Sequence, residues 1–237
     1  MIPVYQYFTF DGKSSRDFEV WISGNGTFNT PERDVERVPV PGRNGEVTFD
    51  NGRFNNIDIT YPAFINGDFR ENFDAFKAYL HSRIGYKRLS DSYHPEYFRL
   101  AQFIASINPE MTALNRAGRF EVTFNCDPRR FLVSGEKEMT LSSSGSIKNP
   151  TYYDALPLIR AYGTGSFTIG GTTVSILAAS SYTDIDSEIQ EAYKGTINCN
   201  GDISLSNGSF PVLSPGVNQI SMSGITRLVI TPRWWSV

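Results

Sequence analysis

Residues 55–82, NNIDITYPAFINGDFRENFDAFKAYLHS, contain a change of hydrophobic spacing that predicts two successive elements. In the first half, Ile57, Ile59 and Tyr61 alternate with other residues, which is typical of a β-strand with one buried face. In the second half, hydrophobic residues recur three or four positions apart and line one face of a helix over 69–82. These residues are Phe69, Phe73, Phe76 and Leu80. We therefore expect an amphipathic helix that packs on a sheet and keeps one side in water.

The expected helix has signals at both ends. Asp68, followed three residues later by Glu71, matches an N-cap with a capping-box partner, in which side chains accept the unpaired N–H groups of the first turn. Gly85 is a typical residue just beyond a helix end.

Before this region, the sequence predicts a hairpin. Residues 35–40 (VERVPV) and 46–49 (EVTF) have strand composition, and Pro41, Gly42, Arg43, Asn44 and Gly45 lie between them. Pro-Gly and Asn-Gly are both turn dipeptides. Two earlier runs, 5–10 (YQYFTF) and 18–22 (FEVWI), also have the pattern of strands.

After the helix, the sequence predicts strands almost everywhere. Residues 97–106 and 118–126 complete the first half, and a Ser- and Gly-rich stretch over 134–150 is typical of a linker or a flexible edge. We place a domain boundary near residue 136, which gives domains 1–136 and 137–237. Short strand-like runs in the second domain have the spacing of a β-sandwich. Residues 185–193 also fit a helical period, but strand–turn–strand is preferred because strands flank them.

Composition and charge exclude several function classes. The 237 residues carry 22 Lys plus Arg and 25 Asp plus Glu, so the net charge is −3 and a general nucleic-acid coat is excluded. The N-terminal ten residues lack the basic start and apolar run of a signal peptide, and no stretch approaches a membrane span. We expect a protein made in the cytoplasm and not inserted into a membrane. Cys126 and Cys199, with His81 and His94, form no metal-ligand pattern, so we expect no metal and no cofactor.

The sequence offers little for catalysis. Asp184, Asp186 and Glu188 could supply the paired carboxylates of glycoside hydrolysis, but a solvated strand end has the same composition. Motifs for a nucleophile elbow or a nucleotide-phosphate loop are absent. We therefore expect a protein that is not an enzyme, and glycan cleavage is the weakest hypothesis.

Two groups of residues could bind partners. Arg129 and Arg130, with Arg116 and Arg119 nearby, form a small basic group that is more typical of a solvated edge or a subunit contact than of a phosphate site. Trp234 and Trp235 could stack on a sugar, or one could be core while the other covers an interface.

Taken together, the order of these motifs resembles the distal tail proteins of long-tailed siphophages. In the first half, the resemblance rests on Val38 to Gly45 (VPVPGRNG) followed by a strand, the helix at 69–82, and Phe124 to Pro128 (FNCDP). In the second half, it rests on the following segments in order: 149–150 (NP), 157–163 (PLIRAYG), 184–188 (DIDSE), 208–211 (GSFP), 213–218 (LSPGVN) and 230–235 (ITPRWW).

This resemblance implies a mainly β fold, with an N-terminal β-sandwich that carries one α-helix and a protruding hairpin, plus a C-terminal galectin-like β-sandwich. It implies a structural protein of the virion tail tip or baseplate. Six copies would form a ring that links the tail-tube protein to the tail-associated hub protein, and DNA would pass through its lumen. The C-terminal domain could hold a receptor-binding protein, and the hairpin at Pro41 to Gly45 would be an assembly element.

A second hypothesis is a carbohydrate-binding module that recognises host surface glycans through Trp234, Trp235 or Tyr182. The galectin likeness implied by the family is one of architecture, because the galactoside-binding residues of galectins are not found here, and fold alone does not confer binding.

The near-neutral charge of the chain agrees with a channel through which DNA passes without binding tightly, and with no sequence-specific nucleic-acid binding.

Overall fold

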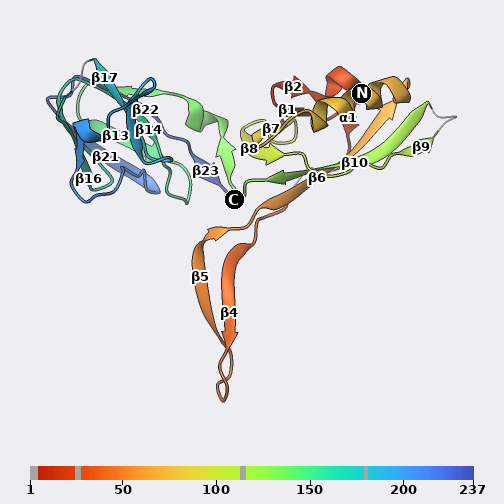
Figure 1. The fold of residues 1–237 in the computed structure, drawn as a ribbon, viewed down its shortest axis with the longest axis horizontal. Coiled ribbons are helices and arrows are strands. Elements are labelled where there is room, and N and C mark those ends of the chain that lie inside the picture. Colours follow the sequence, from red (N-terminus) through yellow and green to blue (C-terminus); the bar gives the residue numbers. More distant parts are fainter. Residues whose placement is uncertain (1–4, 25–27, 113–115, 179–180) are drawn as a thin grey trace. The chain divides into compact units, whose positions relative to one another are not determined.

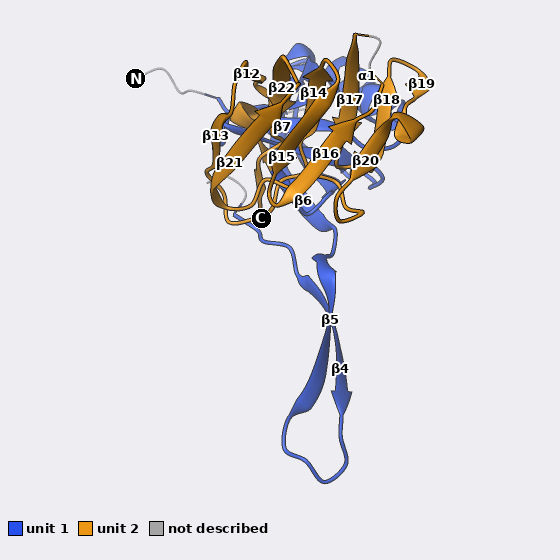
Figure 2. Ribbon diagram, turned by 90° about the vertical axis from the view of Figure 1, so that its left-hand side faces the viewer, with its two compact units in different colours: residues 1–130, 237 blue, residues 131–236 orange. Residues whose placement is uncertain are grey.

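The computed structural model describes residues 5–24, 28–112, 116–178 and 181–237. The chain is mainly β, as the sequence predicts, and it forms two compact units (Figures 1 and 2). The first unit comprises residues 1–130 together with Val237, and the second comprises residues 131–236. The chain thus passes from one unit to the other between Arg130 and Phe131.

The first unit contains a largely antiparallel sheet with the strand order β2-β1-β7-β8-β10-β6-β3, and β9 pairs with β10. Its strands are β1 (Phe8–Phe10), β2 (Lys13–Ser14), β3 (Trp21–Ile22), β6 (Ile57–Asn66), β7 (Lys87–Asp91), β8 (Tyr97–Gln102), β9 (Glu110–Thr112) and β10 (Ala117–Cys126). Phe8 of β1 stacks on Tyr61 of β6 with ring centroids 5.3 Å apart, although three strands separate them in the sheet. The sheet therefore curls around an aromatic core.

The helix α1 (Phe69–His81) closes this core, as the sequence predicts. Its buried residues are the four of the predicted stripe, and Phe73 contacts Phe120 of β10 edge-on with ring centroids 5.1 Å apart. The helix starts very close to the sheet, because a Cβ added at Gly118 would lie 2.4 Å from the Phe69 ring. Gly118 is therefore the residue that allows the close approach of α1 to β10.

Two local predictions in this unit are wrong. Asp68 adopts a left-handed conformation (φ 45°), and its side chain makes no capping hydrogen bond to α1. The chain turns sharply at Gly67 and Asp68 to bring α1 back over the sheet, and this turn displaces the Asp68 side chain from the N-cap geometry. Residues 18–22 are not one strand, since a 3₁₀ turn, η1 (Ser15–Phe18), precedes the short β3.

The second unit is a β-sandwich of two antiparallel sheets. The first sheet has the order β12-β22-β14-β17-β18-β19: β12 (Met139–Leu141), β14 (Leu158–Tyr162), β17 (Tyr182–Asp186), β18 (Glu191–Lys194), β19 (Ile197–Asn198) and β22 (Arg227–Thr231). The second has the order β13-β21-β15-β16-β20: β13 (Gly145–Asn149), β15 (Gly165–Ile169), β16 (Thr172–Ile176), β20 (Ile203–Leu205) and β21 (Gly216–Ser223). The remaining elements are β11 (Arg130–Leu132), which pairs with β23 (Trp235–Ser236), and the 3₁₀ turns η2 (Val133–Glu136) and η3 (Asn200–Asp202).

The core of the second unit lies between these sheets. Ile159 and Ile185 from one sheet and Phe167 and Val174 from the other belong to the same buried cluster. Residues 185–193 form strand, turn and strand, which confirms the preferred interpretation. The Ser-rich stretch is not a linker but an edge segment of the second unit, because it contains β12 and β13, which pair with β22 and β21 at the ends of their sheets, and the turn between them. Serine is common in turns, so composition alone did not separate the two cases.

Candidate assembly surface

The predicted hairpin forms a separate two-stranded sheet of the first unit. Strands β4 (Arg33–Pro39) and β5 (Glu46–Phe54) pair with each other and with no other described strand. The ribbon of this hairpin extends away from the rest of its unit in Figure 2. Its residues are exposed or half-buried throughout, so the hairpin contributes nothing to the core of the first unit. An isolated two-stranded hairpin is at best marginally stable in water.

The tip of the hairpin contains the residues that the sequence singled out. Pro41 and Gly42 occupy the central positions of a turn that is closed by a hydrogen bond from the Arg43 N–H to the Val40 carbonyl, 3.2 Å long. Gly42 has φ 78°, as the third position of a type II turn requires. Gly45 also has a positive φ, and all residues of the loop are exposed. The turn chemistry expected from the sequence is therefore present, and the exposed tip packs on none of the buried residues that the structure describes.

The two faces of the hairpin differ in character. Val38 lies opposite Val47, and Glu36 lies opposite Phe49, so these four side chains share one face. Phe49 is 56% exposed, and Val38 is 37% exposed. The other face carries the pairs Arg37–Thr48 and Pro39–Glu46. One face is thus largely apolar and unburied, which is typical of a surface that another protein covers.

Salt bridges hold the base of the hairpin. Arg33 donates to Asp50 over 2.8 Å, and Arg53 donates to Asp34 over 2.7 Å. The N–H of Gly52 also donates to Asp50, and this bond together with Arg33 lowers the pKa of the Asp50 carboxyl. These bonds fix the register where the two strands leave the unit.

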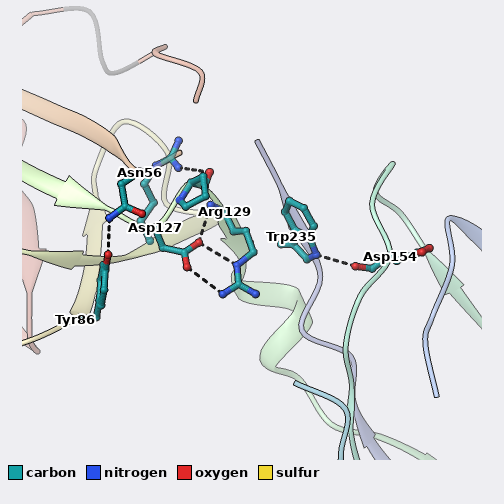
Figure 3. Close-up of polar contacts among 8 residues, drawn as sticks. Asn56, Tyr86, Asp127, Arg129, Asp154 and Trp235 are labelled. Carbon is teal, nitrogen blue, oxygen red and sulfur yellow. Dashed lines mark hydrogen bonds and ion pairs between the residues drawn. The ribbon is translucent and has the colours of Figure 1, made fainter. Parts of the chain in front are cut away.

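The return strand of the hairpin is fastened to the curled sheet by an amide side chain. The Nδ2 group of Asn56 donates to the Tyr86 hydroxyl over 2.5 Å (Figure 3) and to Oδ1 of Asn125 over 2.8 Å. Asn125 in turn donates to Asp58. The base of the hairpin is therefore rigidly attached, while its apolar face and its tip stay exposed.

The two C-terminal tryptophans have different environments. Trp234 is 2% exposed and belongs to the core of the second unit, so its indole is not available for stacking on a ligand. Trp235 is half-buried and stacks on Tyr153 with ring centroids 4.4 Å apart, and its Nε1–H donates to the Asp154 carbonyl (Figure 3). The structure therefore does not bring the two tryptophans together into one stacking platform.

The carboxylates of β17 are each paired with an arginine. Asp184 accepts two hydrogen bonds from Arg160, and Asp186 accepts two from Arg233. Both carboxylates are therefore engaged in ion pairs within the second unit. In the basic group, Arg129 binds Asp127, and the Arg130 guanidinium lies over the Tyr97 ring at 4.1 Å.

Cys126 and Cys199 are free thiols, one buried and one half-buried. Within the described ranges, no group of three metal-binding side chains comes together. In the same part of the chain, no helix has the length and apolar character needed to cross a membrane.

Sequence reasoning identified the tip of the hairpin but missed its apolar face. The signal was available in the strands themselves, since Val38, Val47 and Phe49 are hydrophobic residues in runs that alternate with polar ones. Such alternation predicts a buried face, and its exposure shows only once the hairpin is seen to contribute nothing to the core of its own unit.

No protein-family model and no curated protein matches this sequence. The fold does match solved structures. The crystal structure of the Dit protein of phage SPP1, described as a paradigm of the hub adsorption apparatus in phages that infect Gram-positive bacteria, has a TM-score of 0.73. The match has 14% sequence identity and covers 99% of this chain and 100% of that chain.

Two further matches come from the baseplate of phage P2 in its activated conformation. The structure with calcium has a TM-score of 0.51 and the structure with strontium 0.52, each at 10% identity over 96% of this chain and 97% of that chain. At these identities the likeness establishes the fold: this chain has the fold of phage hub and baseplate proteins.

Proposed function

We propose that this protein is a distal tail protein of a long-tailed phage, located at the tail tip, where it joins the tail tube to the adsorption apparatus. The observation that carries this proposal is the full-length match to the SPP1 Dit protein, which leaves neither unit of this chain unmatched. A binding module alone would account for only one of the two units.

The assembled form that fits this role is a ring of six copies with a central channel for DNA. The apolar face of the hairpin supports it, because a protein that functioned as a monomer would leave Phe49 and Val38 in water. The net charge of −3 agrees with a channel wall that does not bind the phosphate backbone.

Within the virion, the ring would contact the tail-tube protein on one side and the tail-associated hub protein on the other. The second unit would carry a receptor-binding protein or another peripheral component. Neither role requires an enzyme activity or a cofactor, and the pairing of Asp184 and Asp186 with arginines supports a structural role for this unit.

The direct test is the mass of the purified protein by light scattering after size exclusion, with and without the tail-tube protein, and negative-stain imaging of the same peak. We expect a ring of about 160 kDa, corresponding to six chains of 26.6 kDa. A chain that stays monomeric even with the tail-tube protein present would refute the proposal.

A pair of variants tests the hairpin as the assembly element. Phe49→Asp places a charge on the apolar face, where desolvating it in an interface is costly, and we expect it to abolish ring formation. Thr48→Asp adds the same charge to the adjacent, oppositely facing position and should reduce ring formation much less. Both variants should keep the monomer's circular dichroism and melting temperature, since neither residue is in a core. Equal assembly of the two variants would show that the apolar face is not the contact.

A further inference from the structure

An arginine occupies a core position of the first unit. Arg99 lies on β8 directly opposite Leu89 of β7, and Ala101, two residues further on, points to the same face of the sheet. Leu89 is 2% exposed and Ala101 is 0% exposed, and Arg99 itself is only 8% exposed. Because residues alternate between the two faces of this strand, position 99 faces the core, where an apolar side chain is expected. A guanidinium group at such a position indicates a specific role.

This buried charge has no counter-ion among the residues that the structure describes. Its one hydrogen bond runs from Nη1 to the Pro128 carbonyl, 3.0 Å away. Asp127, the next residue along the chain, is held by both ends of the Arg129 guanidinium (Figure 3). Asp91 on β7 already accepts hydrogen bonds from the Tyr61 hydroxyl and from the N–H groups of Tyr93 and His94.

Two other ionisable groups near Arg99, a thiol and a phenol, do not neutralise its charge either. Burial raises the pKa of the Cys126 thiol to about 12, so this group is uncharged at neutral pH. Burial also raises the pKa of the Tyr61 hydroxyl well above its usual value. Burial lowers the pKa of Arg99, and Arg130 lowers it further by repulsion, so a second cation lies close to the first.

A small cavity opens over this site. It is lined by Ser90, Asp91, His94, Tyr97, Arg99 and Arg130, among other residues. Its volume is about 30 Å³, which is room for about two water-sized groups. The buried Nε2 atom of His94 has no hydrogen-bond partner. The cavity therefore brings together two guanidinium groups, an unpartnered imidazole nitrogen and the already engaged Asp91 carboxylate, and neither guanidinium forms an ion pair with a carboxylate of the described residues.

We propose that this cavity is a binding site for a carboxylate group. A carboxylate has two oxygens, which fit the available volume, and a planar guanidinium recognises such a group through paired hydrogen bonds. His94 Nε2–H and Arg130 would complete its coordination. The carboxylate comes either from an acidic side chain of a neighbouring protein or from a small free acid, and the two sources can be told apart. This site is separate from the hairpin and does not depend on the proposed ring.

The test measures melting temperature and binding heat for the full-length chain at pH 7. Sodium acetate is compared with sodium chloride at equal ionic strength, and the blocked peptide Ac-Gly-Glu-Gly-NH2 is compared with its Gln counterpart. We expect acetate, the Glu peptide or both to raise the melting temperature relative to the matched control. A gain with acetate alone identifies a small free acid as the ligand, and a gain with the Glu peptide identifies a protein side chain. No gain with either probe would overturn the proposal.

Three variants connect the binding to this cavity. Arg99→Met keeps an unbranched stem, and we expect it to weaken acetate or Glu-peptide binding about tenfold to a hundredfold, the value of a charged hydrogen bond. In chloride it should melt at the same temperature or higher, because it removes an uncompensated buried charge. Arg130→Met should also weaken binding, and it is the test should Arg99→Met fail to fold. Arg88→Met, an exposed arginine on the adjacent β7, is the matched control and should bind as the wild type does. Equal binding by all three variants would overturn the proposal.

Discussion

Asp184 and Asp186 lie two residues apart on β17, and each is held by an arginine from a different part of the chain. The Asp184 and Asp186 side chains are 5% and 6% exposed, so both charges are largely removed from water. Burial opposes ionisation of Asp186, but the hydrogen bonds from Arg233 and from the backbone N–H of Glu188 outweigh it, and its pKa lies below the usual value. Such pairs fix geometry more than they add stability, but breaking one leaves a buried charge without its partner.

We therefore expect Asp186→Asn to lower the free energy of unfolding by about 3 kcal/mol, because Arg233 loses its counter-ion. Urea denaturation at pH 7 measures this. The Arg53–Asp34 pair on the hairpin, in which the arginine side chain is 73% exposed, is the control, and Asp34→Asn should leave the free energy of unfolding unchanged within error. A similar loss in both variants would contradict the argument from burial.

The same pair predicts a dependence on acid pH. The folded-state pKa of Asp186 is lower than that of the unfolded chain, so its contribution to stability is complete above about pH 4 and is lost as the pH falls through the folded value. The difference in unfolding free energy between wild type and Asp186→Asn should therefore shrink steadily below pH 4. A difference that stays constant down to pH 2 would show that the ionised carboxylate is not the cause.

At the scale of single residues, the sequence showed which residue types occur together but not which other side chains they contact. It identified Asp184 and Asp186 as a cluster, whereas the partner of Asp186 lies 47 residues along the chain. It offered core and interface as alternatives for the two tryptophans but could not say that Trp234 is the buried one. It missed Arg99 entirely, because a single charge inside a hydrophobic run looks like a solvated position until the register of the sheet is known.

At the scale of elements, prediction succeeded where a period extends over several residues. The helix α1 and the strands β6, β10 and β14 lie where alternation or helical spacing places them. It failed where tertiary contacts decide short segments. The turn at Asp68 and the 3₁₀ turn before β3 depend on how the chain must bend to cover the core, which no local pattern records.

The hairpin allows a prediction about its backbone dynamics. Because its strands pair only with each other and bury no core residue, their amides should exchange with solvent far faster than those of β6 and β10 in the free chain. Hydrogen exchange followed by mass spectrometry measures this. In the assembled ring, exchange in residues 33–54 should slow by at least about tenfold, while β14 and β17 in the second unit stay unchanged. Equal protection of the hairpin before and after assembly would contradict its role as a contact.

At the scale of the whole molecule, the chain has two separate hydrophobic clusters. One contains the aromatic residues of the first unit, such as Phe124, and the other contains Ile159 and its neighbours in the second unit. The sequence predicted two domains because composition changes between them. It placed a boundary near residue 136 because the Ser-rich turn after β12 has the composition of a linker, whereas the residues around Arg130, where the two units divide, do not.

Separate clusters predict separate responses to core truncation. Phe124→Ala and Ile159→Ala each remove a fully buried side chain, and each should cost about 3 kcal/mol. In differential scanning calorimetry, we expect each substitution to lower one thermal transition by roughly 10 °C or more and leave the other in place. A single transition that both substitutions shift equally would show that the units unfold together.

The separation of the hairpin from the core of its own unit has an evolutionary consequence. Most positions in a protein are constrained first by folding, and a change there is removed before its effect on binding can matter. Residues 33–54 are not under this folding constraint, because their side chains are not part of a hydrophobic core. Selection on this segment therefore acts almost entirely through the surface it meets, so it can diverge as fast as its partner does while the two units remain recognisable.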